Sequence, residues 1–201
     1  RTIHDNVRDL GVERITLRYV DGDAGRTSAA DRRTFGADAW VADVDLGWGL
    51  RDQPSGTGTM EVALTLVDTP EGVAFAAAGG YDAPAPLWLL ADLAVAESRR
   101  SLVAVANPAE LDRYAGLADR AVREVRAVIP RWRGRLVVQV PSGADQLHEL
   151  LDAEDGTYDA IAAVTATVDG SVDPAAPVHI LVNPEVFERL GAEGSQIVMS
   201  H

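Results

Sequence analysis

Two segments in the early part of the chain alternate apolar and polar residues with a period of two. This pattern restricts the fold more than any other feature. Residues 39–50 place on one face Trp40, Val44, Leu46, Trp48 and Leu50. Residues 59–68 do the same with Met60, Val62, Leu64 and Leu66. Such alternation is typical of strands with one buried face, and the short turn between the segments predicts that they pair antiparallel.

Further strands are expected beside this pair. In residues 12–20, Ile15, Leu17 and Tyr19 alternate with polar residues, which predicts a half-buried strand. Residues 73–80 follow a short turn, and residues 100–106 form another apolar run. The Gly-, Asp- and Ser-rich residues 21–36 are expected to form a loop, and the Pro-rich residues 81–90 a crossover. The sequence therefore predicts an antiparallel meander in residues 1–105.

After residue 105 the pattern changes to alternating helices and strands. Asn107 and Pro108 suit the start of a helix, and apolar residues then recur at steps of three and four up to Pro130. Beyond it we expect strands in 134–141, 160–170 and 177–184, and helices in 143–153 and 185–191. The predicted fold class is α+β, with an antiparallel-sheet-rich domain in residues 1–105 and a smaller α/β unit in residues 106–201.

The composition excludes some partners and some kinds of site. The chain has 31 acidic and 18 basic residues and a net charge of −13, and such a surface repels phosphate backbones, so no nucleic acid is expected to bind. There is no cysteine, which excludes disulfides and cysteine-ligated zinc. No segment approaches the roughly 18 to 20 apolar residues that a membrane span requires. Because the chain opens without methionine or a signal-peptide pattern, we expect a piece of a longer protein.

Two motifs begin like metal sites without completing them. HELLD (148–152) starts as the zinc motif His-Glu-x-x-His, but Asp152 stands in place of the second histidine. Aspartate can bind zinc, although His148 and Asp152 also fit a solvated pair on a surface helix, which is the interpretation we prefer. DGDAG (21–25) imitates a calcium loop with its glycine misplaced, so we expect a hairpin tip. The isolated histidines His4 and His179 are expected to have structural roles.

Three tryptophans form the candidate pocket of the first part. Trp40, Trp48 and Trp88 could line a ligand site, although Trp40 and Trp48 share a face with aliphatic neighbours and also fit core packing. Asp43 and Asp45 point to the opposite face, which we expect to be solvated. No complete catalytic set is found in the sequence, so the catalytic residues are predicted to be absent from this chain.

The end of the chain holds the candidate metal ligand. An apolar run, Ile197 to Met199, is followed by Ser200 and His201. With Ser195 as a cap, the expected helix has about a turn and a half, whereas isolated helices need roughly 12 to 15 residues. We therefore expect the helix to continue or to be covered. Ile197 and His201 share a helix face, and a histidine after an apolar run on a core-bound helix is a candidate metal ligand.

Three segments together resemble a known group of proteins. They are PAPLWLLADLAVAESRRSLVAVAN, LADRAVREVRAVIPRWRGRLVVQVPSGADQLHELL and VHILVNPEVFERLGAEGSQIVMSH, within residues 80–201. They resemble actinobacterial extracytoplasmic proteins identified as gluzincin-type zinc metallopeptidases, which are usually membrane-anchored or lipoproteins. In that group a helix, a strand, a helix, further strands and an Asn-Pro pair precede an apolar run that enters His-Glu-x-x-His. The resemblance implies that His201 is the first histidine of this motif, with the remaining ligands and the catalytic glutamate beyond residue 201.

Residues 1–105 resemble the cone-shaped domains of the nuclear transport factor two-like or cystatin-like superfold, in which a curved antiparallel sheet wraps around a helix. The resemblance implies a curved sheet, and a shared fold assigns no ligand.

Two functional hypotheses follow. In the first, the chain is the non-catalytic extracytoplasmic front portion of a zinc metallopeptidase. Zinc is then bound only in the full-length protein, the substrate is a peptide or protein, and the membrane is reached only through an anchor outside this chain. The strand VHILVN (178–183) is expected to be the sheet edge along which the peptide lies. In the second, the chain is an extracytoplasmic ligand- or protein-binding module, or a spacer, without catalysis.

Overall fold

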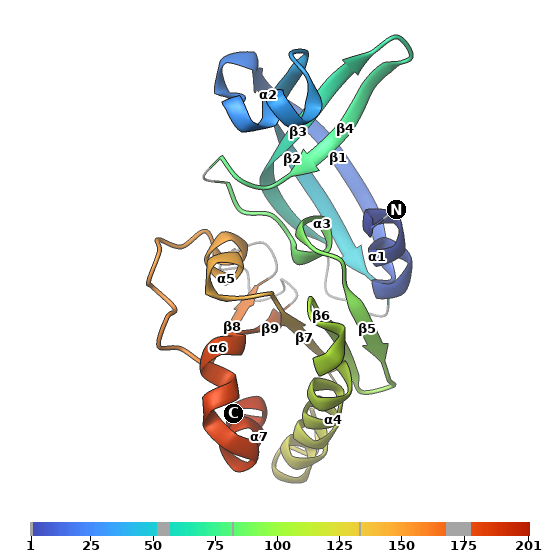
Figure 1. Cartoon of the computed structure of the whole chain (residues 1–201). Helices are drawn as coiled ribbons and strands as arrows, with labels where there is room; N and C mark the ends of the chain where they lie inside the picture. The colour runs from blue at the N-terminus through green and yellow to red at the C-terminus, as the bar shows by residue number, and fades with distance from the viewer. Residues whose placement is uncertain (1, 52–56, 82, 133, 168–177) are drawn as a thin grey trace.

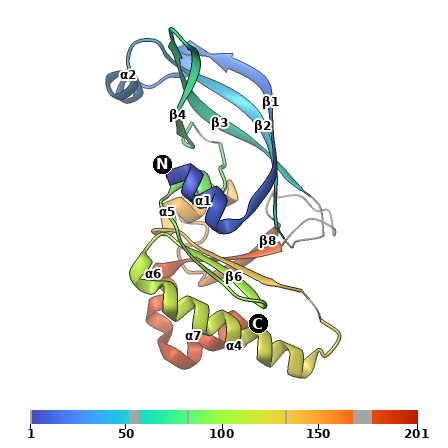
Figure 2. The ribbon, with the colours of Figure 1, turned by 90° about the vertical axis from the view of Figure 1, so that its right-hand side faces the viewer.

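The first sheet is an antiparallel meander, as the sequence predicts. The computed structural model describes residues 2–51, 57–81, 83–132, 134–167 and 178–201. Strands β1 (Val12–Asp23), β2 (Ala39–Leu50), β3 (Gly58–Thr69) and β4 (Gly72–Ala78) pair in chain order. Figures 1 and 2 show that this sheet is long and curved. The fold is α+β, which confirms the predicted class.

The second sheet is mixed and begins before the predicted domain boundary. Its order is β5 (Ala94–Glu97), β6 (Ser101–Val105), β7 (Leu136–Val140), β9 (Val178–Val182) and β8 (Ala163–Thr167). The three central strands run parallel, while β5 and β8 are antiparallel to their neighbours. Strands β5 and β6 thus pair with the later part of the chain. The domain boundary between residues 105 and 106 stays a prediction. The described strands before Ala94 belong to the first sheet, and those from Ala94 onward belong to the second.

The helices include several that the sequence patterns did not suggest. They are α1 (Thr2–Leu10), α2 (Ala29–Phe35), α3 (Leu87–Leu90), α4 (Leu111–Val128), α5 (Ala144–Leu151), α6 (Pro184–Phe187) and α7 (Gly191–Ser200). The expected loop over residues 21–36 is wrong, because β1 continues to Asp23 and the Ser28 hydroxyl caps α2 by accepting from Asp31 N–H at 3.0 Å. Asn107 is a cap as predicted, since its Oδ1 accepts from Ala109 N–H at 3.2 Å, but it caps a 3-10 turn over Pro108–Glu110, and α4 begins after this turn at Leu111.

The predicted burial of the first sheet needs two corrections. Strand β1 is not half-buried, because Leu17 and Tyr19 are 63% and 60% exposed at the edge of the described sheet. Nor are Asp43 and Asp45 on a solvated face. Their side chains are only 19% and 22% exposed, and they pair with Arg26 and Arg18 respectively. The segment that leads into α2 covers part of this face, which the alternation in the sequence does not reveal.

One hydrophobic cluster joins the two sheets. It combines side chains from five strands with α1 and α3, among them Leu10, Val12, Val44, Leu46, Trp48, Val62, Leu64, Trp88, Leu102, Ala104 and Val137. Figure 2 shows the first sheet and α1 on one side of the second sheet. Because Leu102 and Ala104 come from the second sheet, neither sheet has this core to itself.

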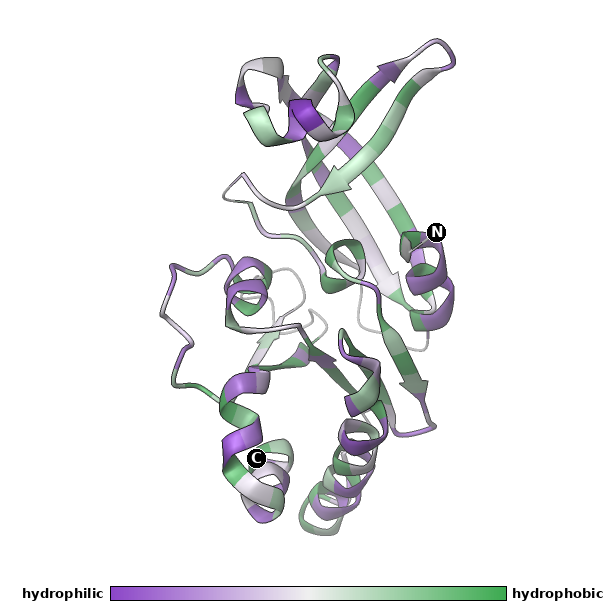
Figure 3. Ribbon diagram, in the orientation of Figure 1, coloured by the Kyte–Doolittle hydropathy of each residue, from purple (hydrophilic) through white to green (hydrophobic). Residues whose placement is uncertain are grey.

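A second cluster lies on the opposite face of the second sheet. Val103, Val105 and Val138 point to this face and pack with Tyr114 of α4 and Met199 of α7. In Figure 3, hydrophobic and hydrophilic residues alternate along α4, as expected for a helix with one buried face. The central strands are therefore covered on both faces, as parallel strands usually are.

Among the described residues, no helix combines the length and apolarity needed to cross a membrane.

A buried asparagine fixes the junction between the sheets. Asn6 is 3% exposed, and its amide group donates to Trp88 O at 2.9 Å and to Ala91 O at 2.7 Å. Its carbonyl oxygen accepts from Leu93 N–H at 3.1 Å. One side chain thus satisfies three backbone groups, one in α3 and two in the segment that leads from α3 to β5, and it holds α1 against them.

Replacing Asn6 by alanine should therefore destabilise the protein. The Asn6→Ala variant loses three hydrogen bonds and leaves buried backbone groups without partners, which we expect to lower the free energy of unfolding by about 2 to 4 kcal/mol. Urea denaturation followed by circular dichroism measures the change. His4→Ala, an exposed position on the same helix, is the control and should change stability by less than about 0.5 kcal/mol. Equal effects of the two substitutions would contradict the assigned role of Asn6.

Candidate functional site

The structure brings together two of the three candidate tryptophans. The rings of Trp48 and Trp88 lie edge to face, with centroids 6.3 Å apart and an interplanar angle of 67°. Trp40 lies at the other end of β2, where its indole N–H donates to Asp68 Oδ1 at 3.1 Å and its ring packs against Tyr19. Trp40 is therefore not part of the same pocket.

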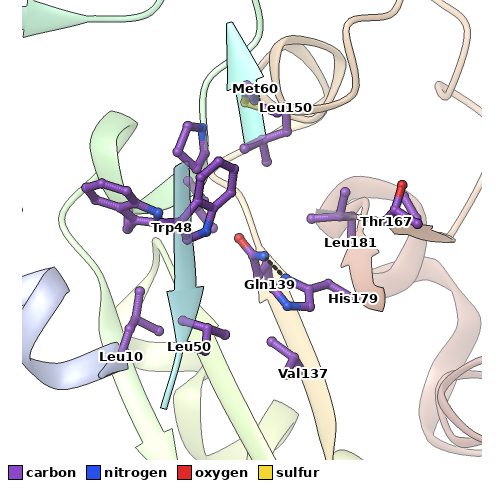
Figure 4. Close-up of a pocket in the computed structure, with 14 residues that line it drawn as sticks. Leu10, Trp48, Leu50, Met60, Val137, Gln139, Leu150, Thr167, His179 and Leu181 are labelled. Atoms are coloured by element: carbon purple, nitrogen blue, oxygen red, sulfur yellow. Dashed lines mark hydrogen bonds between the residues drawn. The ribbon is translucent and has the colours of Figure 1, made fainter. Parts of the chain in front are cut away.

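Trp48 and Trp88 border a small cavity between the two sheets. Its volume is about 40 Å³, and Figure 4 shows side chains from both sheets pointing into it. The lining is mainly apolar, with Gln139, Thr167 and His179 as polar members. A water molecule needs at least about 10 to 15 Å³ by this kind of measure. The cavity can therefore hold on the order of one to three waters, and a larger ligand would require the sheets to separate.

Two polar residues from neighbouring strands meet at this cavity. Gln139 of β7 and His179 of β9 have their side chains 2.5 Å apart, between Nε2 and Nδ1 (Figure 4). Burial lowers the pKa of His179 to about 3, since the charged ring is disfavoured away from water. His179 is therefore neutral at physiological pH, and its Nδ1 accepts the amide proton of Gln139. The structural role predicted for His179 is consistent with this burial.

Trp88 adds a polar atom without a partner. Its indole Nε1 is buried, and it has no hydrogen-bond partner among the residues that the structure describes. A buried N–H without an acceptor is costly, and the adjacent cavity has room for a water that could accept this proton. The arrangement can thus hold a small polar molecule.

His201 lies at the end of a helix that packs on α4. Ser195, Gln196 and Met199 are buried, whereas Ile197 is 61% exposed and His201 is exposed. The expectation that Ser195 caps this helix is wrong, because α7 begins at Gly191 and Ser195 lies within it. The Ser195 hydroxyl donates to Phe187 O of the preceding helix α6 at 3.4 Å. His201 remains in the helical hydrogen-bond pattern, because its N–H donates to Ile197 O at 3.0 Å.

Polar contacts from α7 to α4 hold the last turn before His201. The Ser200 hydroxyl donates to Glu124 Oε2 at 2.6 Å, and Gln196 Nε2 reaches the same atom at 3.3 Å. The bond from Ser200, together with one from Arg120, lowers the pKa of the Glu124 carboxyl below its usual value. Glu124 therefore stays ionised and anchors the end of α7.

Within the described part of the chain, no group of three or more His, Asp or Glu side chains is arranged to hold a metal ion. His148 and Asp152 are not a solvated pair, since His148 is only 4% exposed and Asp152 is the left-handed C-cap of α5. DGDAG is not a hairpin tip either: it spans the end of β1 and the start of a 3-10 turn that leads toward α2. His4 is exposed at the surface of α1.

The strand expected to form the substrate edge is not an edge. VHILV is β9, and it pairs with β7 on one side and with β8 on the other. The outer strand on this side of the described sheet is β8, which runs antiparallel to β9. The prediction that VHILVN forms the edge is therefore wrong, because the order of strands in the sheet differs from their order in the chain.

The comparison with known proteins assigns no relative. No protein-family model, no curated protein and no solved structure matches this chain. Sequence reasoning also missed the contact between Gln139 and His179. The available signal was a single polar residue inside each of two apolar strands, LVVQV and VHILV, which fold side by side.

The burial of His179 predicts a pH-dependent loss of stability. Unfolded histidine binds a proton near pH 6.5, but His179 in the folded protein does so only near pH 3. The free energy of unfolding should therefore fall as the pH drops below about 6.5. Between pH 7 and pH 5, we expect His179 to account for a decrease of about 2 kcal/mol. Urea denaturation at both pH values measures it.

The His179→Asn variant keeps an acceptor for Gln139 but removes the titration, so its stability should change less between the two pH values. His4→Asn, which alters an exposed histidine, should keep the pH dependence of the wild type. An unchanged pH dependence in His179→Asn would show that another group causes it.

Proposed function

We propose that this chain is the non-catalytic, extracytoplasmic front portion of a zinc metallopeptidase of the gluzincin type. In this proposal the chain provides the sheet and the backing helix of the peptidase unit, and His201 is the first zinc ligand. The other ligands and the catalytic glutamate are proposed to follow residue 201 in the full-length protein. The membrane anchor is likewise assigned to the full-length protein and not to these residues.

The observation that carries the proposal is the order and packing of the elements before His201. The resemblance implies a helix, a strand, a helix, further strands and an Asn-Pro pair, and α4, β7, α5, β8 and β9 occur in that order. Asn183 then caps α6 by accepting from Glu185 N–H at 3.1 Å, and Pro184 is in the first turn. From there the chain enters α7, whose Met199 is buried against the second sheet and α4.

The packing of α7 also suits a ligand at its end. The buried Met199 and the bonds to Glu124 fix the helix, while the imidazole of His201 remains exposed. Figure 2 shows that α4 extends beyond the end of α7, so it could support a further turn of that helix. A rigid helix that presents an accessible ring is what an assembled metal site requires.

The described residues do not by themselves fit a catalytic zinc ion. Catalytic zinc takes three protein ligands and leaves one position for water, whereas the described residues include no group of three candidate ligands. In the proposal, peptide hydrolysis therefore depends on residues outside this chain. Its contribution in the proposal is to position His201 and to offer the outer edge of β8, where a peptide backbone could pair as an added strand.

The alternative, a binding module without catalysis, has one observation in its favour. This is the orphan indole N–H of Trp88 beside the cavity between the sheets. The small volume of that cavity limits a ligand to a few atoms, so we regard this function as the second candidate.

Zinc content of the full-length protein tests the main proposal. We expect about one zinc ion per chain by mass spectrometry of the metal content, and loss of most of it in His201→Ala, because removing a side chain that binds the zinc directly weakens zinc binding strongly. His4→Ala is the matched control and should keep its zinc. Sequencing the coding region after His201 should reveal Glu-x-x-His. A different sequence, or zinc retained by His201→Ala, would overturn the proposal.

A further inference from the structure

The first sheet carries an exposed apolar surface on the part that extends away from the second sheet. Figure 1 shows that the β3–β4 turn lies at this remote end. We call the surface the open patch. The strand register places its members on the same face as the core residue Val44, and they are Leu17, Tyr19, Trp40, Leu66, Val73 and Phe75. Leu17, Tyr19 and Val73 are 63%, 60% and 60% exposed, and Phe75 is 46% exposed.

Aromatic side chains connect the open patch across all four strands. The rings of Tyr19 and Trp40 meet edge to face with centroids 6.5 Å apart. Trp40 lies opposite Leu66 of β3, and Leu66 lies opposite Phe75 of β4. Both rings lie close to Gly22, where a Cβ would meet the Tyr19 hydroxyl and the Trp40 indole. A continuous exposed apolar surface on a protein marks an interaction site, and aromatic rings provide most of its binding energy.

One charged residue lies on this face among those that the register places. Asp68 is opposite Val73, and its Oδ1 accepts from the Trp40 indole N–H at 3.1 Å. Among the described residues Asp68 has no further contact, so its Oδ2 is available to a partner. Arg18 lies on the opposite face, where it pairs with Asp45. The open patch therefore presents a carboxylate beside aromatic rings.

Helix α1 already occupies another part of the same face. Its apolar residues Ile3, Val7 and Leu10 pack against the cluster that contains Leu46 and Trp48 of β2. With 9 residues α1 is about 14 Å long, whereas β2, with 12 residues, is about 40 Å long. One short helix therefore leaves much of the face uncovered. The open patch continues the surface on which α1 packs.

The width of the open patch fits one helix. It crosses four strands, and three spacings of about 4.8 Å give a width of about 14 Å. A helix with its side chains is about 10 to 12 Å wide. An extended peptide instead pairs through its backbone with the edge of a sheet, so it would leave most of this face uncovered.

We propose that the open patch is the docking site of an amphipathic helix from a partner protein, with basic residues beside its apolar stripe. The apolar stripe packs on Tyr19, Trp40 and Phe75, and a lysine or arginine pairs with Asp68 Oδ2. A second copy of this chain fits less well, because two chains with a net charge of −13 repel each other. The proposal does not depend on the peptidase assignment or on zinc.

Calorimetric titration with model peptides tests the proposal. The probe is a blocked peptide with two repeats of Leu-Lys-Lys-Leu-Leu-Lys-Leu, which has the apolar spacing of a helix. Two repeats of Leu-Lys-Leu-Lys-Leu-Lys-Leu have the same composition but the spacing of a strand. The helical peptide should bind at least about tenfold more tightly than the alternating one. Equal affinities would overturn the assignment of a helix.

Two double variants separate the open patch from general apolar attraction. Tyr19→Thr with Phe75→Thr removes two exposed apolar side chains and keeps residues that favour strands. Affinity for the helical peptide should fall by about tenfold or more. Val128→Thr with Ile129→Thr changes positions of 82% and 53% exposure at the end of α4 and should leave affinity unchanged. Equal losses in the two double variants would place the binding elsewhere.

The charge of Asp68 is tested by Asp68→Asn. Asparagine keeps an oxygen that accepts from the Trp40 indole, but it removes the charge that attracts lysine. The helical peptide should bind about threefold to tenfold more weakly. Asp38→Asn removes the same charge from an exposed position elsewhere and is the control. Equal effects of the two substitutions would mean that only net charge attracts the peptide.

The indole N–H signals give an independent readout of the position of the peptide. The chain has four tryptophans, and ¹⁵N-resolved spectra should show a shift of Trp40 on binding, with Trp48 and Trp88 unchanged. Absence of binding, or binding that leaves the Trp40 signal unmoved, would overturn the proposal.

Light scattering distinguishes a partner helix from a second copy on the open patch. The wild type should be a monomer, with a mass of 21.3 kDa. A wild-type dimer that Tyr19→Thr with Phe75→Thr converts to a monomer would show that a second copy occupies the face, and it would overturn the proposal.

Discussion

The need to cover both faces of the second sheet determines the arrangement of the rest of the molecule. Alternate residues of β6 point in opposite directions: Leu102 and Ala104 toward the first sheet, Val103 and Val105 toward α4. Parallel strands of this kind are stable only when both faces are shielded from water. The curved first sheet, with α1, shields one face, and α4 with α7 shields the other. The cavity between the sheets and the position of His201 both depend on these two layers.

Buried polar groups then determine how the layers fit together. Asn6 bonds three backbone groups at the junction, and Gln139 and His179 pair across neighbouring strands. Each of these groups costs free energy if it is buried without its partner. A shift of α1 would leave the partners of Asn6 unsatisfied, and a shift of β9 along β7 would separate His179 from Gln139, so these groups favour a single arrangement.

Local patterns in the sequence predicted the elements better than their surroundings. The alternation in residues 39–50 was sufficient to predict β2, and Asn107 was sufficient to predict a cap before the long helix. Strand alternation and helix capping are both determined by nearby residues. The exposure of Leu17, the ion pair of Asp43 and the burial of His148 were mispredicted, because each depends on which distant segment lies nearby. The same holds for β9, whose central place in the sheet follows from strand order. Of the tryptophan pocket, only Trp48 and Trp88 meet.

The shared hydrophobic cluster also limits how such a protein could arise or be divided. Leu46 and Trp48 come from one sheet and Leu102 and Val137 from the other, yet they form one core. A gene broken between the two sheets would yield two polypeptides, each with part of this apolar surface in water. Neither half could readily be inherited alone or joined to an unrelated neighbour. The two sheets should therefore be gained or lost together in evolution.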